Sequence, residues 1–262
     1  MHERLIEINA PHGRLAAVLH HPGASAEPPS LVIYCPGKNG ERSDVHRLGV
    51  NFARRAAALG IAVLRFDYSG VGLSDGDYHE MTVSSKVSDT IAVYRYACGL
   101  PDLNTATTAF LGFSDGARTA LLAANQTGVN RLILWSPLFQ EWGGGYPQGR
   151  HPRFVRHPLH PLLPVMPWAG LWVGMPFYKD LQQLDLPEQM RSYNGTSIVI
   201  YGEEDPLVAE ERIRMDTESL PLFDDDSDHR VCAIPQADHL FASIEHGECL
   251  LDHTLCWLRS HA

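Results

Sequence analysis

The sequence has no uninterrupted apolar run of the roughly 18 residues that a membrane-spanning helix requires. From Met1 to Ile6 it also lacks the basic segment and apolar stretch of a secretory signal. None of its 5 cysteines forms a Cys-x-x-Cys pair, and Cys35 and Cys232 stand inside apolar runs, where buried free thiols are typical. We therefore expect a soluble protein of a reducing compartment, the cytoplasm, without a disulfide framework.

Positive charge is scarce too. The chain carries 21 Lys and Arg against 31 Asp and Glu, so it lacks the basic face that nucleic-acid binding needs. The exception is the basic stretch from Arg150 to His160, which is either a solvated edge or a rim for an anionic substrate group or an acidic acyl carrier protein. Its prolines space the histidines irregularly, and no acid or cysteine joins them. We therefore expect no metal there, and no cofactor is indicated.

What the sequence does contain is an alternation of short apolar runs with helical patterns. The runs predict eight strands, at residues 4–9, 14–20, 31–35, 61–66, 106–113, 131–135, 197–201 and 230–234. The first two are joined by a Pro-His-Gly turn and predict an antiparallel hairpin at the sheet edge. The later strands are apolar throughout, as in a parallel sheet covered on both faces. We predict a single α/β domain over residues 1–262, with a mostly parallel sheet and helices on both faces.

One helical pattern runs from residue 83 to residue 98. Val83, Val87 and Ile91 lie on one face of it, and its other side carries Ser85, Lys86 and Asp89.

Residues 138–190 break the alternation, and only 179–191 resembles a helix. An insert of this length is usually a functional lid or a disordered segment, and its many aromatic residues make it too apolar for disorder. We predict a cap folded over the carboxyl edge of the sheet. Its candidate substrate-binding residues are Trp142, Arg153, Phe154, Arg156, Trp168 and Trp172.

The pattern Gly-x-Ser-x-Gly occurs twice, as Gly72-Leu-Ser74-Asp-Gly76 and as Gly112-Phe-Ser114-Asp-Gly116. Ser74 lies in a polar loop eight residues past Phe66 and is not followed by a helical pattern. Ser114 comes directly after a predicted strand and directly before an Ala- and Leu-rich helical pattern. A serine on such a turn projects its hydroxyl outward, and small neighbours let the two backbones pass closely. Ser114 is therefore the candidate nucleophile, and Ser74 is expected to be a loop residue.

A nucleophilic serine needs a base, and the base needs a carboxylate that orients it. Asp205 follows the predicted strand 197–201, and His239 follows the predicted strand 230–234. Because the carboxyl ends of parallel strands meet at one edge, we expect both near Ser114. Glu203 or Glu204 could replace Asp205 as the acid, and His239 could be a mere surface histidine.

These three motifs, in this order, resemble the α/β-hydrolase superfamily, and the resemblance covers nearly the whole chain. The segment Asp67-Tyr-Ser-Gly-Val-Gly-Leu-Ser74 also resembles the superfamily's loop after the fourth strand. The resemblance implies an oxyanion hole made by the backbone N–H groups of Lys38 and Asp115, although Pro36-Gly37 stands where the superfamily often has His-Gly. The Asp115 carboxylate is unexpected beside an oxyanion, and either turns away or pairs with Arg118.

Within the superfamily the chain is most similar to capped esterases, acyl hydrolases and monoglyceride-lipase-like proteins. The resemblance implies hydrolysis of an ester through an acyl-enzyme, with a hydrophobic small molecule as substrate. Two alternatives stay open: a thioesterase or acyltransferase acting on CoA- or carrier-linked acyl groups, and a non-catalytic binding protein that keeps the fold. An aspartate nucleophile at Asp115 is disfavoured, because that residue is out of register with the flanking glycines.

Overall fold

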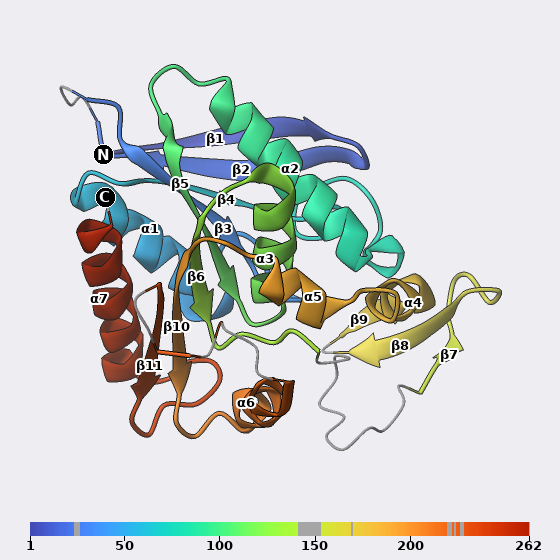
Figure 1. Cartoon of the computed structure of the whole chain (residues 1–262). Coiled ribbons are helices and arrows are strands. Elements are labelled where there is room, and N and C mark those ends of the chain that lie inside the picture. Colours follow the sequence, from blue (N-terminus) through green and yellow to red (C-terminus); the bar gives the residue numbers. More distant parts are fainter. Residues whose placement is uncertain are drawn as a thin grey trace.

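The computed structural model of the chain describes residues 1–23, 27–140, 153–168, 170–218, 222, 224–225 and 228–261. Its main feature is an eight-stranded sheet with the strand order β1-β2-β4-β3-β5-β6-β10-β11 (Figure 1). The strands are β1 (His2–Ala10), β2 (Gly13–His21), β3 (Ser30–Cys35), β4 (Ala62–Phe66), β5 (Asn104–Phe113), β6 (Arg131–Trp135), β10 (Thr196–Gly202) and β11 (His229–Ile234).

The pairing of these strands follows the predicted pattern. β1 and β2 form an antiparallel hairpin, and β2 also pairs antiparallel with β4. All other neighbours in the sheet are parallel. The predicted eight-stranded, mostly parallel sheet with an edge hairpin is therefore confirmed.

Strand β3 shows why the sheet is buried on both faces. Every residue from Leu31 to Cys35 is at most 1% exposed. Ile33 and Cys35 belong to one hydrophobic cluster, and Val32 and Tyr34 belong to a second cluster on the opposite face. Side chains of a strand alternate between faces, so a strand between two helical layers must be apolar at every position.

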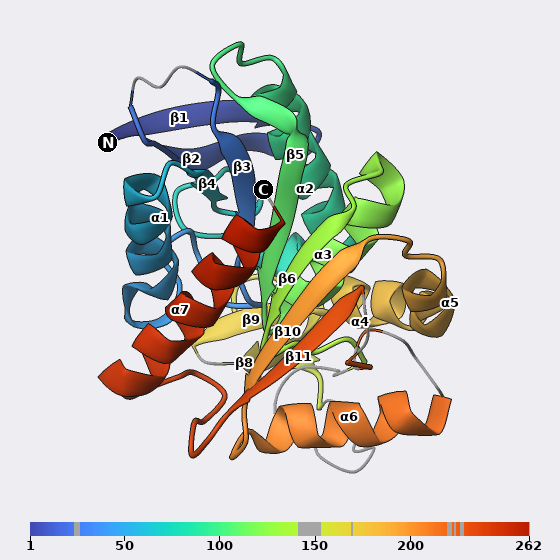
Figure 2. The same ribbon diagram turned by 60° about the vertical axis from the view of Figure 1, so that its left-hand side comes forward.

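Helices supply both layers. Helices α1 (Leu48–Ala58) and α7 (Ile244–Ser260) contribute to one cluster, and α2 (Val83–Cys98) and α3 (Asp115–Thr127) contribute to the other. Figure 2 shows these two pairs on opposite sides of the sheet. Helix α6 (Pro206–Glu218) follows β10. None of the helices in the described part of the chain is both long and apolar enough to cross a membrane.

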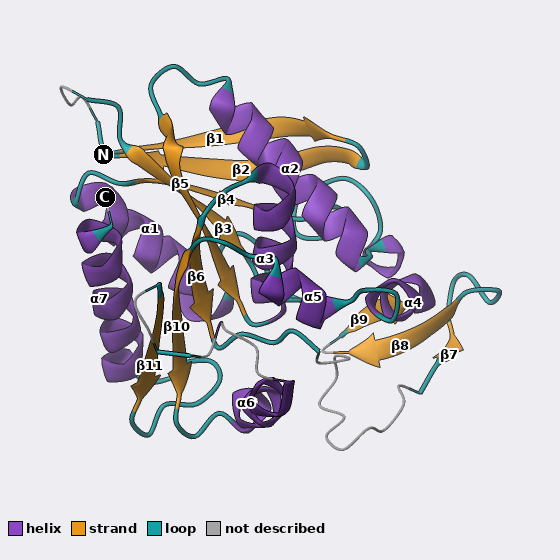
Figure 3. Ribbon diagram, viewed as in Figure 1, coloured by secondary structure: helices purple, strands orange, loops and turns teal. Residues whose placement is uncertain are grey.

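The insert, residues 138–190, contains a small antiparallel sheet of its own (Figure 3). Its strands are β7 (Val155–Arg156), β8 (Pro164–Trp168) and β9 (Leu171–Gly174), and two short helices, α4 (Met175–Leu181) and α5 (Leu186–Arg191), come after them. The continuous helix predicted over 179–191 is wrong. The chain leaves α4 after Leu181, and Asp185 begins a new helix by accepting a hydrogen bond from the Glu188 N–H at 3.0 Å.

The insert packs beside the carboxyl edge of the main sheet. Strand β9 contacts the 3₁₀ turn η2 (Tyr78–Glu80), which lies in the loop after β4. The contact is close at Gly174, where a Cβ atom would stand 1.9 Å from the His79 carbonyl oxygen. A side chain at position 174 would therefore push the insert off the loop.

Burial differs from the sequence pattern at two places. Ser85, Lys86 and Asp89 are buried, although the helical pattern placed them away from the apolar face of α2. They are tolerated because they have partners: Lys86 pairs with Asp115, and Asp89 accepts the Ser69 N–H at 2.8 Å. All 5 cysteines are free, and Cys35 is buried as expected, but Cys232 is only partly buried because β11 is an edge strand.

Candidate active site

Ser114 stands at the sharp turn between β5 and α3. Its φ of 55° is in the left-handed region, which is strained for a serine. Hydrogen bonds hold the turn: the Ser114 N–H donates to the Trp135 carbonyl at 2.8 Å, and its own carbonyl accepts the Leu138 N–H at 3.1 Å. The turn also needs both glycines, because a Cβ at Gly112 or Gly116 would lie within 2.4 Å or 2.1 Å of a backbone oxygen.

His239 and Asp205 complete a hydrogen-bonded relay with this serine. His239 Nε2 lies 3.0 Å from Ser114 Oγ, and His239 Nδ1 lies 2.7 Å from Asp205 Oδ2. The Asp205 side chain is fully buried, and the His239 side chain is only 16% exposed. The geometry is that of a nucleophile, a base and a carboxylate that holds the base in one orientation.

The two turns that carry Asp205 and His239 are packed against each other. A Cβ at Gly202 would lie 2.2 Å from the Ala237 carbonyl oxygen, and the Glu204 N–H donates to that oxygen at 3.0 Å. Asp205 also begins α6, because its Oδ1 accepts the N–H groups of Leu207 and Val208 at 3.0 and 3.2 Å. The same carboxyl thus serves as a helix cap and as the partner of His239. The alternative acids Glu203 and Glu204 are both exposed.

The cavity beside Ser114 has a volume of about 420 Å³. Lys38 and Asp115, whose backbone N–H groups are the predicted oxyanion donors, both line it together with Ser114 and His239. The Asp115 N–H is the first of α3 and has no acceptor within that helix. Leu138, Leu207 and Leu240 give the cavity apolar walls.

Asp44 was not singled out in the sequence, yet it fixes the loop that carries Lys38. Its Oδ2 accepts the Gly37 N–H at 3.3 Å and the Tyr34 hydroxyl at 3.1 Å. Burial raises the pKa of Asp44, and the hydrogen bonds that it accepts offset this effect only in part. The only sign of this role in the sequence is that Asp44 is an acidic residue soon after a glycine-rich turn.

The Asp115 carboxylate turns inward and pairs with two cations. It contacts the Lys86 ammonium, and its Oδ1 accepts from Arg118 Nη1 at 2.5 Å. Burial alone would raise the pKa of Asp115, but the charges of Lys86, Arg118 and Lys38 outweigh burial and hold that pKa well below its usual range. The predicted pairing with Arg118 is present, and Lys86 is an additional partner from α2. Because Lys86 and Arg118 compensate the negative charge of this carboxylate, it is compatible with an oxyanion nearby.

Arg118 also ties the start of the insert to the turn at Ser114. Its Nε donates to the Phe139 carbonyl at 2.6 Å. Leu138 is held by its bond to the Ser114 carbonyl, and the Gln140 N–H donates to the buried Glu211 carboxylate at 3.0 and 3.2 Å. Three consecutive residues, 138–140, are thereby fixed to the body of the protein.

The second Gly-x-Ser-x-Gly segment forms a scaffold. Ser74 Oγ donates to the Asp67 carbonyl at 2.7 Å and accepts the Ala16 N–H at 2.9 Å, so it joins the loop to β2. The Asp67 carboxylate pairs with the Arg42 guanidinium and accepts the Arg42 N–H at 2.7 Å. Arg42 follows the turn that carries Lys38, so the Asp67 loop supports that turn.

Most predicted residues of the insert lie away from the cavity. Trp142 is outside the described residues, as is the side chain of Trp168. Phe154 packs on Tyr178 at 5.2 Å between ring centroids, and Trp172 lies 5.9 Å from the His157 ring. Neither of them lines the cavity, and nor do the exposed Arg153 and Arg156. Of the described insert, Leu138 lines the cavity, and the Phe177 ring lies 5.0 Å from Nζ of the lining residue Lys38.

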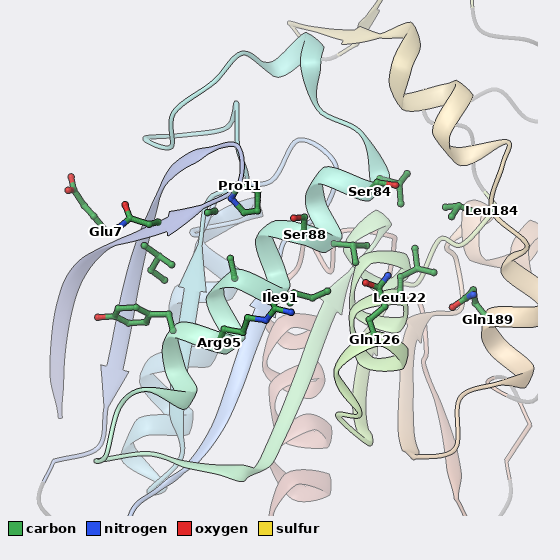
Figure 4. A pocket seen from close by; sticks show the side chains of 17 residues that line it. Glu7, Pro11, Ser84, Ser88, Ile91, Arg95, Leu122, Gln126, Leu184 and Gln189 are labelled. Carbon is green, nitrogen blue, oxygen red and sulfur yellow. The ribbon is translucent and has the colours of Figure 1, made fainter.

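A larger hollow, of about 980 Å³, lies elsewhere on the molecule. Figure 4 shows residues of β1, α2, α3 and α5 around it, among them Ile91, Arg95, Leu122 and Gln189. No member of the Ser114 relay lines this larger hollow, so the candidate site does not coincide with it. The described residues hold no group of three or more His, Cys, Asp or Glu arranged for a metal ion.

Comparisons with known proteins show the family and the fold of the chain. The family model described as "Serine aminopeptidase, S33" (Hydrolase_4) matches residues 26–218. An uncharacterized protein of Mycobacterium tuberculosis is 31% identical over 118 residues, which are 45% of this chain and 40% of the relative. The match thus spans about two fifths of that curated relative's length.

Two solved structures resemble the whole chain. Est1E from Butyrivibrio proteoclasticus, with ferulic acid bound, has a TM-score of 0.80 at 20% identity and 98% coverage of both chains. An alpha-beta serine hydrolase homologue from Coxiella burnetii has a TM-score of 0.62 at 19% identity, covering 100% of this chain and 99% of its own. At such identities the likeness is one of fold.

Proposed function

Because the chain belongs to the serine aminopeptidase S33 family (Hydrolase_4) and has its α/β-hydrolase fold, we propose that it is a serine hydrolase that cleaves carboxylic esters. One observation carries the proposal: the relay from Ser114 Oγ through the His239 ring to the Asp205 carboxylate, with contacts of 3.0 and 2.7 Å. A serine, a base and an orienting acid in hydrogen-bond contact are what nucleophilic acyl transfer requires.

In the proposed reaction His239 Nε2 takes the Ser114 proton while Oγ attacks the substrate carbonyl carbon. The N–H groups of Lys38 and Asp115 stabilise the oxyanion that develops. His239 then donates its proton to the leaving alcohol, which departs and leaves an acyl-serine. Water attacks this ester with His239 again as base, and the carboxylic acid is released. Asp205 holds the ring in orientation and stabilises its charged form.

The cavity supports a small or medium-sized hydrophobic substrate. Its volume of about 420 Å³ and the side chains of Phe113, Leu138, Leu207 and Leu240 suit an apolar acyl or alcohol group. Est1E was solved with ferulic acid, an aromatic carboxylic acid, so esters of aromatic acids belong in the first substrate panel.

Two experiments test the proposal. A fluorophosphonate probe should label Ser114, detected by peptide mass spectrometry, and the Ser74→Ala variant should label as well as the wild type. Absence of label on folded protein would contradict the nucleophile. Turnover of p-nitrophenyl esters should exceed turnover of aminoacyl p-nitroanilides and acyl-CoA thioesters. Faster cleavage of the anilides would make the enzyme a peptidase, and faster cleavage of the thioesters would make it a thioesterase.

A further inference from the structure

Exposed apolar side chains are concentrated on one short segment of the insert. Among the described residues 11 large apolar side chains are exposed, and four of them fall within residues 155–163: Val155, Leu159, Leu162 and Leu163. Leu162 is 95% exposed and Leu159 is 80% exposed. Single exposed leucines are ordinary, but a cluster of them marks a contact surface.

The loop that presents these leucines has a defined backbone. The His157 N–H donates to the Leu163 carbonyl at 2.9 Å, and the Leu163 N–H donates to the His160 carbonyl at 2.9 Å. His157 Nδ1 accepts the N–H groups of Leu159 and His160, both at 3.1 Å. The loop is therefore built to hold its leucines outward, and little ordering entropy remains to be lost on contact.

Positive charge accompanies the leucines. Arg153 and Arg156 are exposed and form no ion pair with any residue that the structure describes, in a chain whose net charge is −10. Arg156 also joins Leu162, Val155 and Pro161 around a hollow of about 480 Å³. Apolar side chains next to cationic ones complement a surface with buried hydrocarbon and anionic headgroups.

We propose that residues 153–163 are a docking surface for an anionic lipid surface. Leu159 and Leu162 enter the boundary between headgroups and acyl chains, and Arg153 and Arg156 pair with lipid phosphates. Figure 1 shows the turn between β7 and β8 at the far end of the insert, clear of the main sheet, so a flat surface can reach it. Protein partners are usually bound through packed pockets around buried anchors, and a protruding tip with nearly full exposure suits insertion into lipid better.

The test is sedimentation of the full chain with vesicles, and it does not depend on the proposed hydrolase activity. The wild type should sediment with vesicles of equal parts phosphatidylglycerol and phosphatidylcholine, and far less with phosphatidylcholine alone. Leu159→Ser/Leu162→Ser should lower the partition coefficient about tenfold or more, because buried apolar area is lost. Arg153→Gln/Arg156→Gln should lower it about fivefold per residue on the anionic vesicles only.

Matched controls come from exposed residues elsewhere. Leu5 is 80% exposed and Ile244 is 81% exposed, so Leu5→Ser/Ile244→Ser removes a similar amount of apolar surface outside the insert. Arg95→Gln removes an exposed arginine from α2. Both controls should leave the partition coefficient within about twofold of the wild type, since neither site touches the lipid. Thermal unfolding should show each variant folded.

Three outcomes would overturn the proposal. The wild type could fail to sediment with either vesicle, or the control variants could lose as much binding as the loop variants. The third is that the loop variants bind vesicles normally but lose binding to an acidic acyl carrier protein or to a second copy, measured by light scattering.

Discussion

The two Gly-x-Ser-x-Gly segments share the letters Gly-x-Ser-Asp-Gly, but the serine and the aspartate have different partners in each. In residues 112–116 the serine hydroxyl meets the His239 ring, and the next aspartate is buried between Lys86 and Arg118. In residues 72–76 the serine hydroxyl bonds only backbone groups, and Asp75 pairs with Arg14 at the surface.

The difference comes from what surrounds each turn. Ser114 follows a central parallel strand, so two later strand ends bring Asp205 and His239 to it. The Ser74 loop lies by the edge hairpin, where β2 binds it through the Ala16 N–H and through the backbone and side chain of Arg14. The same five-residue pattern thus contacts a His–Asp pair in one place and holds loops together in the other.

The largest difference should appear in catalysis. Ser114→Ala should lower kcat by on the order of 10⁴–10⁶-fold, because the nucleophile is lost and only oxyanion and binding effects remain. Ser74→Ala should leave kcat within a few-fold of the wild type. Steady-state kinetics on a p-nitrophenyl ester measures both. An equal loss in both variants would mean that the two serines cannot be distinguished by function.

The next largest difference should appear in stability, when the two aspartates Asp115 and Asp75 are each replaced. Asp115→Ala leaves Lys86 buried without its carboxylate and should lower the free energy of unfolding by about 3–5 kcal/mol. Asp75→Ala removes a surface pair and should leave the melting temperature close to that of the wild type. Urea unfolding followed by circular dichroism compares the two. Adding Lys86→Met to Asp115→Ala should recover part of the loss, because the unpaired cation is removed.

The stability that Asp115 contributes should depend on pH in a predictable direction. The pKa of Asp115 is lowered in the folded protein from the ordinary 3.8, so its stabilisation is complete above that value and is lost as pH falls below it. The stability difference between wild type and Asp115→Asn should be constant from pH 7 to pH 5 and shrink below pH 4. Urea midpoints measured across this range provide the test, and a difference that grew on acidification would contradict the assigned charge.

The smallest expected effect is the loss of stability when the Ser74 hydroxyl is removed. Ser74→Ala removes two hydrogen bonds of a partly buried hydroxyl and leaves the Ala16 N–H without its acceptor. The free energy of unfolding should fall by about 1–2 kcal/mol. Ser74→Thr keeps the hydroxyl and should lose less. If Ser74→Ala were as stable as the wild type, the loop would not depend on this serine.

The sequence predicted those features of the site that depend on which residue follows which strand along the chain. Ser114, Asp205 and His239 each follow a strand, so their meeting at one sheet edge follows from the strand pattern alone. Lys86 could not be placed, because a lysine beside polar neighbours on a helix looks solvated until Asp115 is known to lie under it. Strand β8 was missed because Pro164 and Pro167 disturb its alternation, and the break between α4 and α5 depends on the cap at Asp185.

Hydrogen bonds fix residues 138–140, the start of the insert, to the body of the protein. Leu138, Phe139 and Gln140 are bound to the Ser114 carbonyl, to Arg118 and to Glu211, respectively. The rest of the insert therefore starts from a fixed position. We therefore expect insertions or deletions after residue 140 to leave the turn at Ser114 in place. Under the proposed function, the part of the insert after residue 140 can thus change while Ser114, His239 and Asp205 keep their mutual geometry.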